Sequence, residues 1–199
     1  MTATIADTIY DTLRRQIVTG ELGAGEKLRQ DHIARAFDTS HVPVREALLR
    51  LEAHGLAHSL PRRGMRVTAL DPTEIREVIE MRISLEVLAL QFASPVITPA
   101  ELEVAEKARL LCDEADDIVT WEQRNRAFHW AILKPCRMPR LLATIDDLHT
   151  ASARHLFANQ KQKWTQRQDK DHASIMVALR RKDTQVACDI LRRHLKRVK

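Results

Sequence analysis

Four polar side chains in the second half of the chain have the residue types and the spacing of a metal site. Asn125 and His129 are four residues apart in a helical segment, so both side chains are on one helix face. His172 and His194 lie in two later helical segments. Three imidazoles that converge from three helices suit a divalent ion such as zinc, nickel or cobalt. The alternative is a metal-free polar pocket in which each histidine is hydrogen-bonded within the core.

Arg82 is a candidate for binding an anion. It falls within an apolar stripe that we expect to face inward, formed by Val78, Leu85, Ala89 and Phe92. A buried arginine needs a partner. Glu86 or an acid of a neighbouring helix could provide it as a structural salt bridge. The partner could also be the carboxylate of a small ligand, because a planar guanidinium binds a carboxylate through two hydrogen bonds. Arg154 is a weaker candidate for the same pocket.

A helical domain over residues 71–199 must position these side chains. Thr98 with Glu101 three residues later is a capping-box pattern, and Pro95 and Pro99 break the chain before that helix. The pattern predicts six helices with little strand between them, and hence an all-α antiparallel six-helix bundle. The helices are expected to start near Thr73, Thr98, Ile118, Met138, Thr165 and Asp183.

A second set of candidate residues lies in the short helix predicted over residues 40–55. One apolar stripe follows the i, i+3, i+4, i+7 spacing: Val44, Ala47, Leu48 and Leu51. Ser40 can cap this helix, Pro43 is tolerated in its first turn, and Gly55 can end it. His41 and Arg45 then face outward. A helix that buries one face and exposes an arginine near its start suits the major groove of DNA.

The segments around that helix predict a winged helix-turn-helix. Residues 5–19 and 28–37 are expected to be helices, and Asp38 and Thr39 form the tight turn that leads into the third helix. Residues 57–69 are expected to form a β-hairpin with a basic tip. Arg62 and Arg63 at that tip would contact phosphate or the minor groove, and Gly64 lets the backbone approach closely.

The motif SHVPVREALLRLEAHGL, followed by PRRGMRV, resembles the winged helix of GntR-family bacterial transcription regulators over residues 5–69. The resemblance implies that Arg45 reads a base and that Ser40 contacts a phosphate. Most members of the family have arginine where this chain has His41. The expected DNA-contacting residues are Ser40, His41, Pro43, Arg45, Arg50, Arg62, Arg63 and Gly64.

The second half is similar to the FCD effector domain of the FadR branch of that family, over residues 72–199. The residues NRAFH, then DHASIMVALRRKD, then a histidine 22 residues after the previous one, carry the similarity. It implies a metal held by Asn125, His129, His172 and His194, with zinc first and nickel or cobalt as alternatives. Asn125 departs from the more common aspartate and is a neutral, weaker ligand. In similar FCD proteins an arginine in the context of Arg82 faces the effector.

Composition bounds these expectations. The chain has 199 residues and a net charge of +5, which suits a DNA-binding protein without requiring one. No apolar run approaches the roughly 18–20 residues that span a membrane, so we expect a cytoplasmic protein with no membrane partner. Three widely spaced cysteines predict neither a disulfide framework nor a thiolate zinc site: Cys112, Cys136 and Cys188.

The sequence therefore predicts two domains, a DNA-binding winged helix over residues 1–70 and an effector-binding, dimerising helical domain over residues 71–199. The expected protein is a homodimeric transcription regulator, a repressor by analogy with most relatives. It would bind a near-palindromic double-stranded operator and respond to a small carboxylate. The main alternative is a metallohydrolase fused to a DNA-binding module, but no glycine-rich phosphate loop or G-x-S-x-G motif is present. We therefore expect that the protein is not an enzyme. A DNA-binding architectural protein with a purely dimerising bundle is the third possibility.

Overall fold

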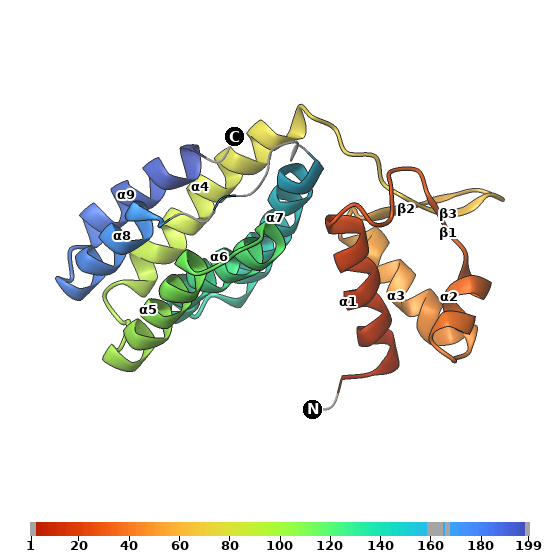
Figure 1. Cartoon of the computed structure of the whole chain (residues 1–199), viewed down its shortest axis with the longest axis horizontal. Coiled ribbons are helices and arrows are strands. Elements are labelled where there is room, and N and C mark those ends of the chain that lie inside the picture. The colour runs from red at the N-terminus through yellow and green to blue at the C-terminus, as the bar shows by residue number, and fades with distance from the viewer. Residues whose placement is uncertain (1–2, 159–164, 166–167, 198–199) are drawn as a thin grey trace. The chain divides into compact units, whose positions relative to one another are not determined.

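The computed structural model describes residues 3–158, 165 and 168–197. The chain divides into two compact units (Figure 1). The first comprises residues 1–72 together with 153–159, and the second comprises residues 73–152 together with 160–199. Both units are mainly helical, and the strands of the described residues lie in the first unit. The predicted fold class is confirmed.

The first unit is a winged helix-turn-helix with a three-stranded antiparallel sheet in the order β1-β3-β2. In β2 and β3, Ala57 pairs with Val67 and Leu60 pairs with Gly64, so the hairpin closes around residues 61–63. The first strand was not predicted; it pairs Lys27 with Arg66 of β3. The elements are α1 (Ile5–Val18), β1 (Lys27–Leu28), α2 (Gln30–Ala36), α3 (His41–Ala53), β2 (Ala57–Leu60) and β3 (Gly64–Val67).

The predicted apolar stripe of α3 forms the centre of the first unit. Val44, Ala47, Leu48 and Leu51 are each at most 1% exposed. Full burial of each large aliphatic side chain contributes about 1.5–3 kcal/mol, so this stripe fixes which face of α3 is left for a partner. Gly55 follows the helix with φ +70°, as its predicted role as a stop requires.

Ser40 is at the N-cap of α3, as predicted, but its side chain makes no capping hydrogen bond. The predicted side-chain cap is therefore wrong in this structure, although its backbone is extended as an N-cap residue requires. The hydroxyl of Ser40 is not committed to the helix end.

Within the described residues, the second unit contains five complete α-helices, one 3-10 turn and residues 139–152 of a sixth helix, α7, whose remaining residues belong to the first unit. Helix α5 packs against α6, and α4 and α8 both pack against α9 (Figure 1). No helix in the described part of the chain has an apolar stretch that could cross a lipid bilayer. The elements are α4 (Glu74–Ala93), α5 (Pro99–Asp113), α6 (Ile118–Leu133), η1 (Lys134–Cys136), α7 (Pro139–Ala158), α8 (Lys170–Arg180) and α9 (Thr184–Lys196).

Helix starts in the second unit follow their capping residues. Thr98 and Glu101 form the predicted capping box at the start of α5. Helix α8 begins five residues later than the predicted start at Thr165, because the Asp169 side chain accepts hydrogen bonds from the backbone N–H groups of Asp171 and His172. This cap places His172 in the first turn of α8.

The predicted inward stripe of α4 is partly wrong. Phe92 is 54% exposed and Leu85 is only half-buried, whereas Glu86 is completely buried. The buried face keeps Arg82 but turns toward Glu86 and Leu90, because buried hydrogen-bond partners compensate the charge of Glu86. A pattern of apolar residues alone cannot predict a buried face with a carboxylate at its centre.

Candidate metal centre and nucleic-acid interface

Three of the four predicted metal-site residues converge in the core of the second unit. His129 of α6, His172 of α8 and His194 of α9 are all buried. The Nε2 atom of His194 lies 3.3 Å from Nε2 of His129 and 3.2 Å from Nε2 of His172. A tetrahedral zinc ion with nitrogen ligands at about 2.0–2.1 Å separates those nitrogens by about 3.3 Å. Both distances from His194 therefore fit a zinc-sized ion, and the ligand nitrogens of all three imidazoles lie within 4.8 Å of one another.

A neighbouring carboxylate determines which ring nitrogen of His129 carries the proton. Oε2 of Glu86 lies 2.8 Å from Nδ1 of His129. Burial alone would raise the pKa of Glu86, but the charge of Arg82, followed by His149 and His129, holds that pKa well below its ordinary value. Glu86 is therefore an ionised acceptor, and His129 donates from Nδ1. On His194, Nδ1 faces Asp169 at 3.6 Å and Asp171 at 3.9 Å.

His172 and His194 are suited to act as ligands because they stay neutral. Burial, followed by the charge of His129, lowers the pKa of His194 to about 4 and holds that of His172 well below its ordinary value. When Nδ1 carries the proton, Nε2 has a free lone pair. At 3.2 to 3.3 Å, two facing ring nitrogens share either a proton or a cation. The donor set is thus the one that zinc, nickel and cobalt prefer.

Asn125, the fourth predicted ligand, lies one turn before His129 on α6. Its Oδ1 atom is buried and has no hydrogen-bond partner, and Nδ1 of His172 is in the same condition. An unsatisfied buried polar atom costs about 1–3 kcal/mol, so each calls for an explanation. The free amide oxygen of Asn125 is available to a ligand, and its place in the metal set stays a prediction.

Arg82 is buried and all three guanidinium nitrogens have neighbours. Nε donates to Oε1 of Glu86 at 2.8 Å and Nη1 donates to the Ser152 hydroxyl at 3.0 Å, while Nη2 lies 3.4 Å from Nε2 of His149. The structural salt bridge with Glu86 is therefore present. Nη2 of Arg154 donates to the Thr68 carbonyl at 2.8 Å, within the first unit.

Sequence reasoning missed three residues that shape the centre. From the sequence, Glu86 is expected only as a partner for Arg82, and neither His149 nor Asp169 is among the candidates. Asp169 could have been found from its position three residues before His172, because an N-cap aspartate accepts hydrogen bonds from backbone N–H groups two and three residues later. No comparable signal marks His149, because only the packing of α7 brings its Nε2 within 3.2 Å of Glu86.

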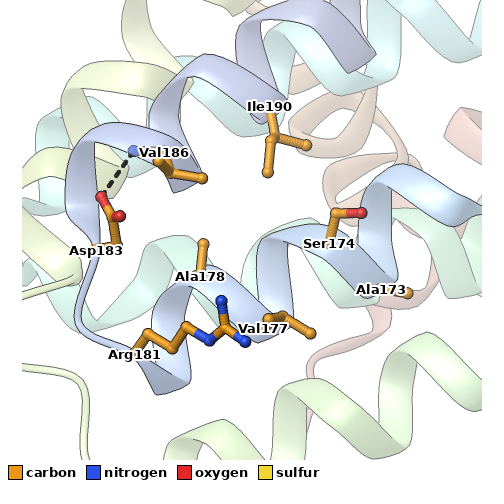
Figure 2. Close-up of a pocket in the computed structure, with 8 residues that line it drawn as sticks. All are labelled: Ala173, Ser174, Val177, Ala178, Arg181, Asp183, Val186 and Ile190. Atoms are coloured by element: carbon orange, nitrogen blue, oxygen red, sulfur yellow. Dashed lines mark hydrogen bonds between the residues drawn. The ribbon is translucent and has the colours of Figure 1, made fainter.

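A pocket of about 430 Å³ lies between α8 and α9 (Figure 2). Asp183 accepts from the Val186 backbone N–H at one end of it. Most of the lining side chains are exposed, and none belongs to the predicted metal or effector set. The lining residues are Ala173, Ser174, Val177, Ala178, Arg181, Asp183, Val186 and Ile190.

The candidate DNA-contacting residues lie on the exposed face of α3 and at the hairpin tip. Ser40, His41 and Arg45 are exposed, as are Arg62, Arg63 and Gly64. Arg62 has φ +61°, a left-handed conformation that the tight turn between β2 and β3 requires. The basic tip predicted for the hairpin is therefore open to a partner.

Arg50 and Pro43 are less available than the other candidates. Nη1 of Arg50 donates to Oδ1 of Asp7 at 2.8 Å, and its guanidinium lies 4.2 Å from the centre of the Tyr10 ring. These contacts connect α3 to α1. Pro43 is half-buried in the first turn of α3. A role of Arg50 in DNA contact stays a prediction, and phosphate would have to compete with Asp7.

Comparison with known families covers both units. Residues 5–67 match the family described as bacterial regulatory proteins, gntR family, and residues 77–197 match the FCD domain. The chain belongs to the GntR family. It is a bacterial DNA-binding transcription regulator of the GntR type, with an FCD effector domain following its winged helix.

Named relatives of this GntR regulator match along nearly its whole length. It is 29% identical to the HTH-type transcriptional repressor GlaR of Escherichia coli K12, over 98% of this chain and 94% of GlaR. It is 25% identical to the HTH-type transcriptional repressor RspR of the same organism, over 99% of this chain and 88% of RspR. The structure of E. coli McbR/YncC shares the fold with a TM-score of 0.82 and 22% identity, covering 98% and 95% of the two chains.

Proposed function

We propose that this GntR regulator is a homodimeric repressor that senses a small organic acid at a metal ion in its FCD domain. The convergence of three buried imidazoles carries this proposal. The FCD match and the repressor relatives GlaR and RspR support it. The two domains would divide the work, with residues 1–70 binding DNA and residues 71–199 binding the effector and the second protomer.

Operator recognition would depend on the exposed residues of the first unit. Arg45 would read a base edge in the major groove, while Ser40 and the arginines of the hairpin tip would contact phosphates. His41 would donate to a base or a phosphate from the first turn of α3. The regulator would bind its operator in the cytoplasm.

Dimerisation would suit a near-palindromic operator, since two copies of α3 would then meet successive major-groove faces. An exposed apolar row on α4 offers a surface for the second copy. Met81, Leu88 and Phe92 are 40%, 37% and 54% exposed. Apolar side chains clustered on one helix face favour association with a like surface.

The metal would be held by His129, His172 and His194, with Asn125 as a further oxygen ligand. When bound, it would supply a Lewis-acidic position for a carboxylate oxygen. Arg82 would face a second anionic group of the effector. Because its three nitrogens already have partners, an incoming carboxylate must replace the contact with Ser152 or His149. Arg154 would contribute only after leaving Thr68. No catalytic role is needed in this account.

Thermal unfolding of the full chain tests this proposal with a panel of small mono- and dicarboxylates. We expect stabilisation by some of these acids in zinc-loaded protein and none in chelator-treated protein, because the metal is part of the binding site. Equal stabilisation with and without metal would contradict metal-dependent sensing. A ligand that stabilises the protein should also change its affinity for operator DNA.

A further inference from the structure

Glu86 is completely buried and lies in contact with groups from three helices. One carboxylate oxygen accepts from Arg82 on its own helix at 2.8 Å and lies 3.2 Å from Nε2 of His149 on α7. The other oxygen lies 2.8 Å from Nδ1 of His129 on α6. Glu86 is not part of the expected ligand set, yet it connects the candidate metal centre to Arg82.

We propose that Glu86 is a positioning residue for the metal ligand His129. Neutral imidazole has one N–H, and the Glu86 carboxylate holds it at Nδ1, so the lone pair stays at Nε2. The same bond fixes the ring orientation, with Nε2 directed at His194. A carboxylate behind a ligating histidine also makes the ligand nitrogen more basic. This inference rests on the proposed metal site.

The geometry favours this role over a simple ion pair with Arg82. The salt bridge uses only Oε1, whereas Oε2 is directed at the ligand ring. An isolated buried ion pair is often no more stable than an apolar pair of the same volume. The buried carboxylate accepts a hydrogen bond from Nδ1 of His129, which an apolar side chain could not do.

Zinc affinity and the visible spectrum of bound cobalt test the role of Glu86. The full chain is stripped with a chelator and titrated with zinc against a chromogenic competitor, and a cobalt-loaded sample is recorded in parallel. Glu86→Gln keeps the shape but removes the charge. The double variant Arg82→Met/Glu86→Gln also removes the charge that the single change leaves unpaired. Glu106→Gln is the matched control, since Glu106 is a largely buried carboxylate bound to Arg109 at 2.7 Å and to Arg180 at 3.1 Å.

We expect both Glu86 variants to bind zinc about 10–100-fold more weakly than the wild type and to show altered cobalt bands. The control should match the wild type in both measurements. Wild-type affinity and spectrum in the folded double variant would overturn the role of Glu86 and leave the metal site standing. A wild-type chain that binds neither ion would overturn the metal site, and this inference with it.

Discussion

The Nε2 atoms of His172 and His194 lie 3.2 Å apart in the core, although the two residues sit on different helices. Neither ring carries a positive charge near neutral pH, since burial lowers the pKa of both. The close approach of two neutral nitrogens, with His129 as a third, is what makes the second unit a candidate metal sensor rather than a plain bundle.

The buried pair of Arg82 and Glu86 predicts a non-additive effect on stability. Arg82→Met leaves the Glu86 carboxylate buried without its main partner and should lower the free energy of unfolding by about 3–5 kcal/mol. Arg82→Met/Glu86→Gln should recover much of that loss, because no unpaired charge remains. Urea unfolding of the metal-free chain measures both. A double variant as unstable as the sum of the single changes would contradict the pairing.

Acidification should destabilise the metal-free protein through His149. Burial, followed by the charge of Arg82, lowers the pKa of His149 to about 4 from its ordinary 6.5. Below pH 6.5 the unfolded chain binds a proton that the folded chain does not, so stability falls as the pH drops toward 4. Urea midpoints between pH 7.5 and 4.5 should fall less steeply in His149→Gln than in the wild type. Equal slopes would rule out this contribution.

Arg45 should determine operator preference. Arg45→Ala should bring operator affinity close to the affinity for unrelated DNA, because a bidentate contact with a base is worth about 1–3 kcal/mol of discrimination. Arg45→Lys keeps the charge and separates base reading from phosphate attraction. Fluorescence anisotropy with operator DNA and with unrelated DNA gives the ratio of the two affinities. If Arg45→Ala retains the wild-type ratio, Arg45 does not read a base.

Arg63 should contribute affinity without specificity. Arg63→Ala should weaken binding to every duplex alike, and the slope of log affinity against log salt should decrease by about 0.9 for one lost phosphate contact. Arg35→Ala is a control, since Arg35 is an exposed arginine of α2 outside the predicted set. An unchanged slope in Arg63→Ala would place the hairpin tip away from the phosphates.

The first unit could be predicted closely because its signals are local. The spacing of Val44, Ala47, Leu48 and Leu51 fixes the face of α3, and Gly55 fixes its end. The strand β1 could not be predicted, since Lys27 and Leu28 carry no strand pattern and pair only because β3 offers a free edge. Arg50 is among the expected DNA-contacting residues, and sequence cannot reveal that Asp7 of another helix binds it.

In the second unit, the helix boundaries could be predicted from the sequence, but the buried face of α4 and the convergence of the histidines could not. Helix starts follow caps such as Thr98 and Asp183, so most boundaries could be predicted. The face of α4 could not, because Glu86 is buried only through partners contributed by other helices. The meeting of His129, His172 and His194 was a hypothesis from residue type, and its geometry required the packing of α6, α8 and α9.

The metal content of freshly purified protein tests the central claim most directly. Elemental analysis of the wild type should give about one zinc, nickel or cobalt ion per chain, as the three-imidazole site requires. The variant His129→Ala/His172→Ala should contain none, while His32→Ala, which changes an exposed histidine of α2, should match the wild type. A wild type without metal, even after metal is added back, would contradict the account.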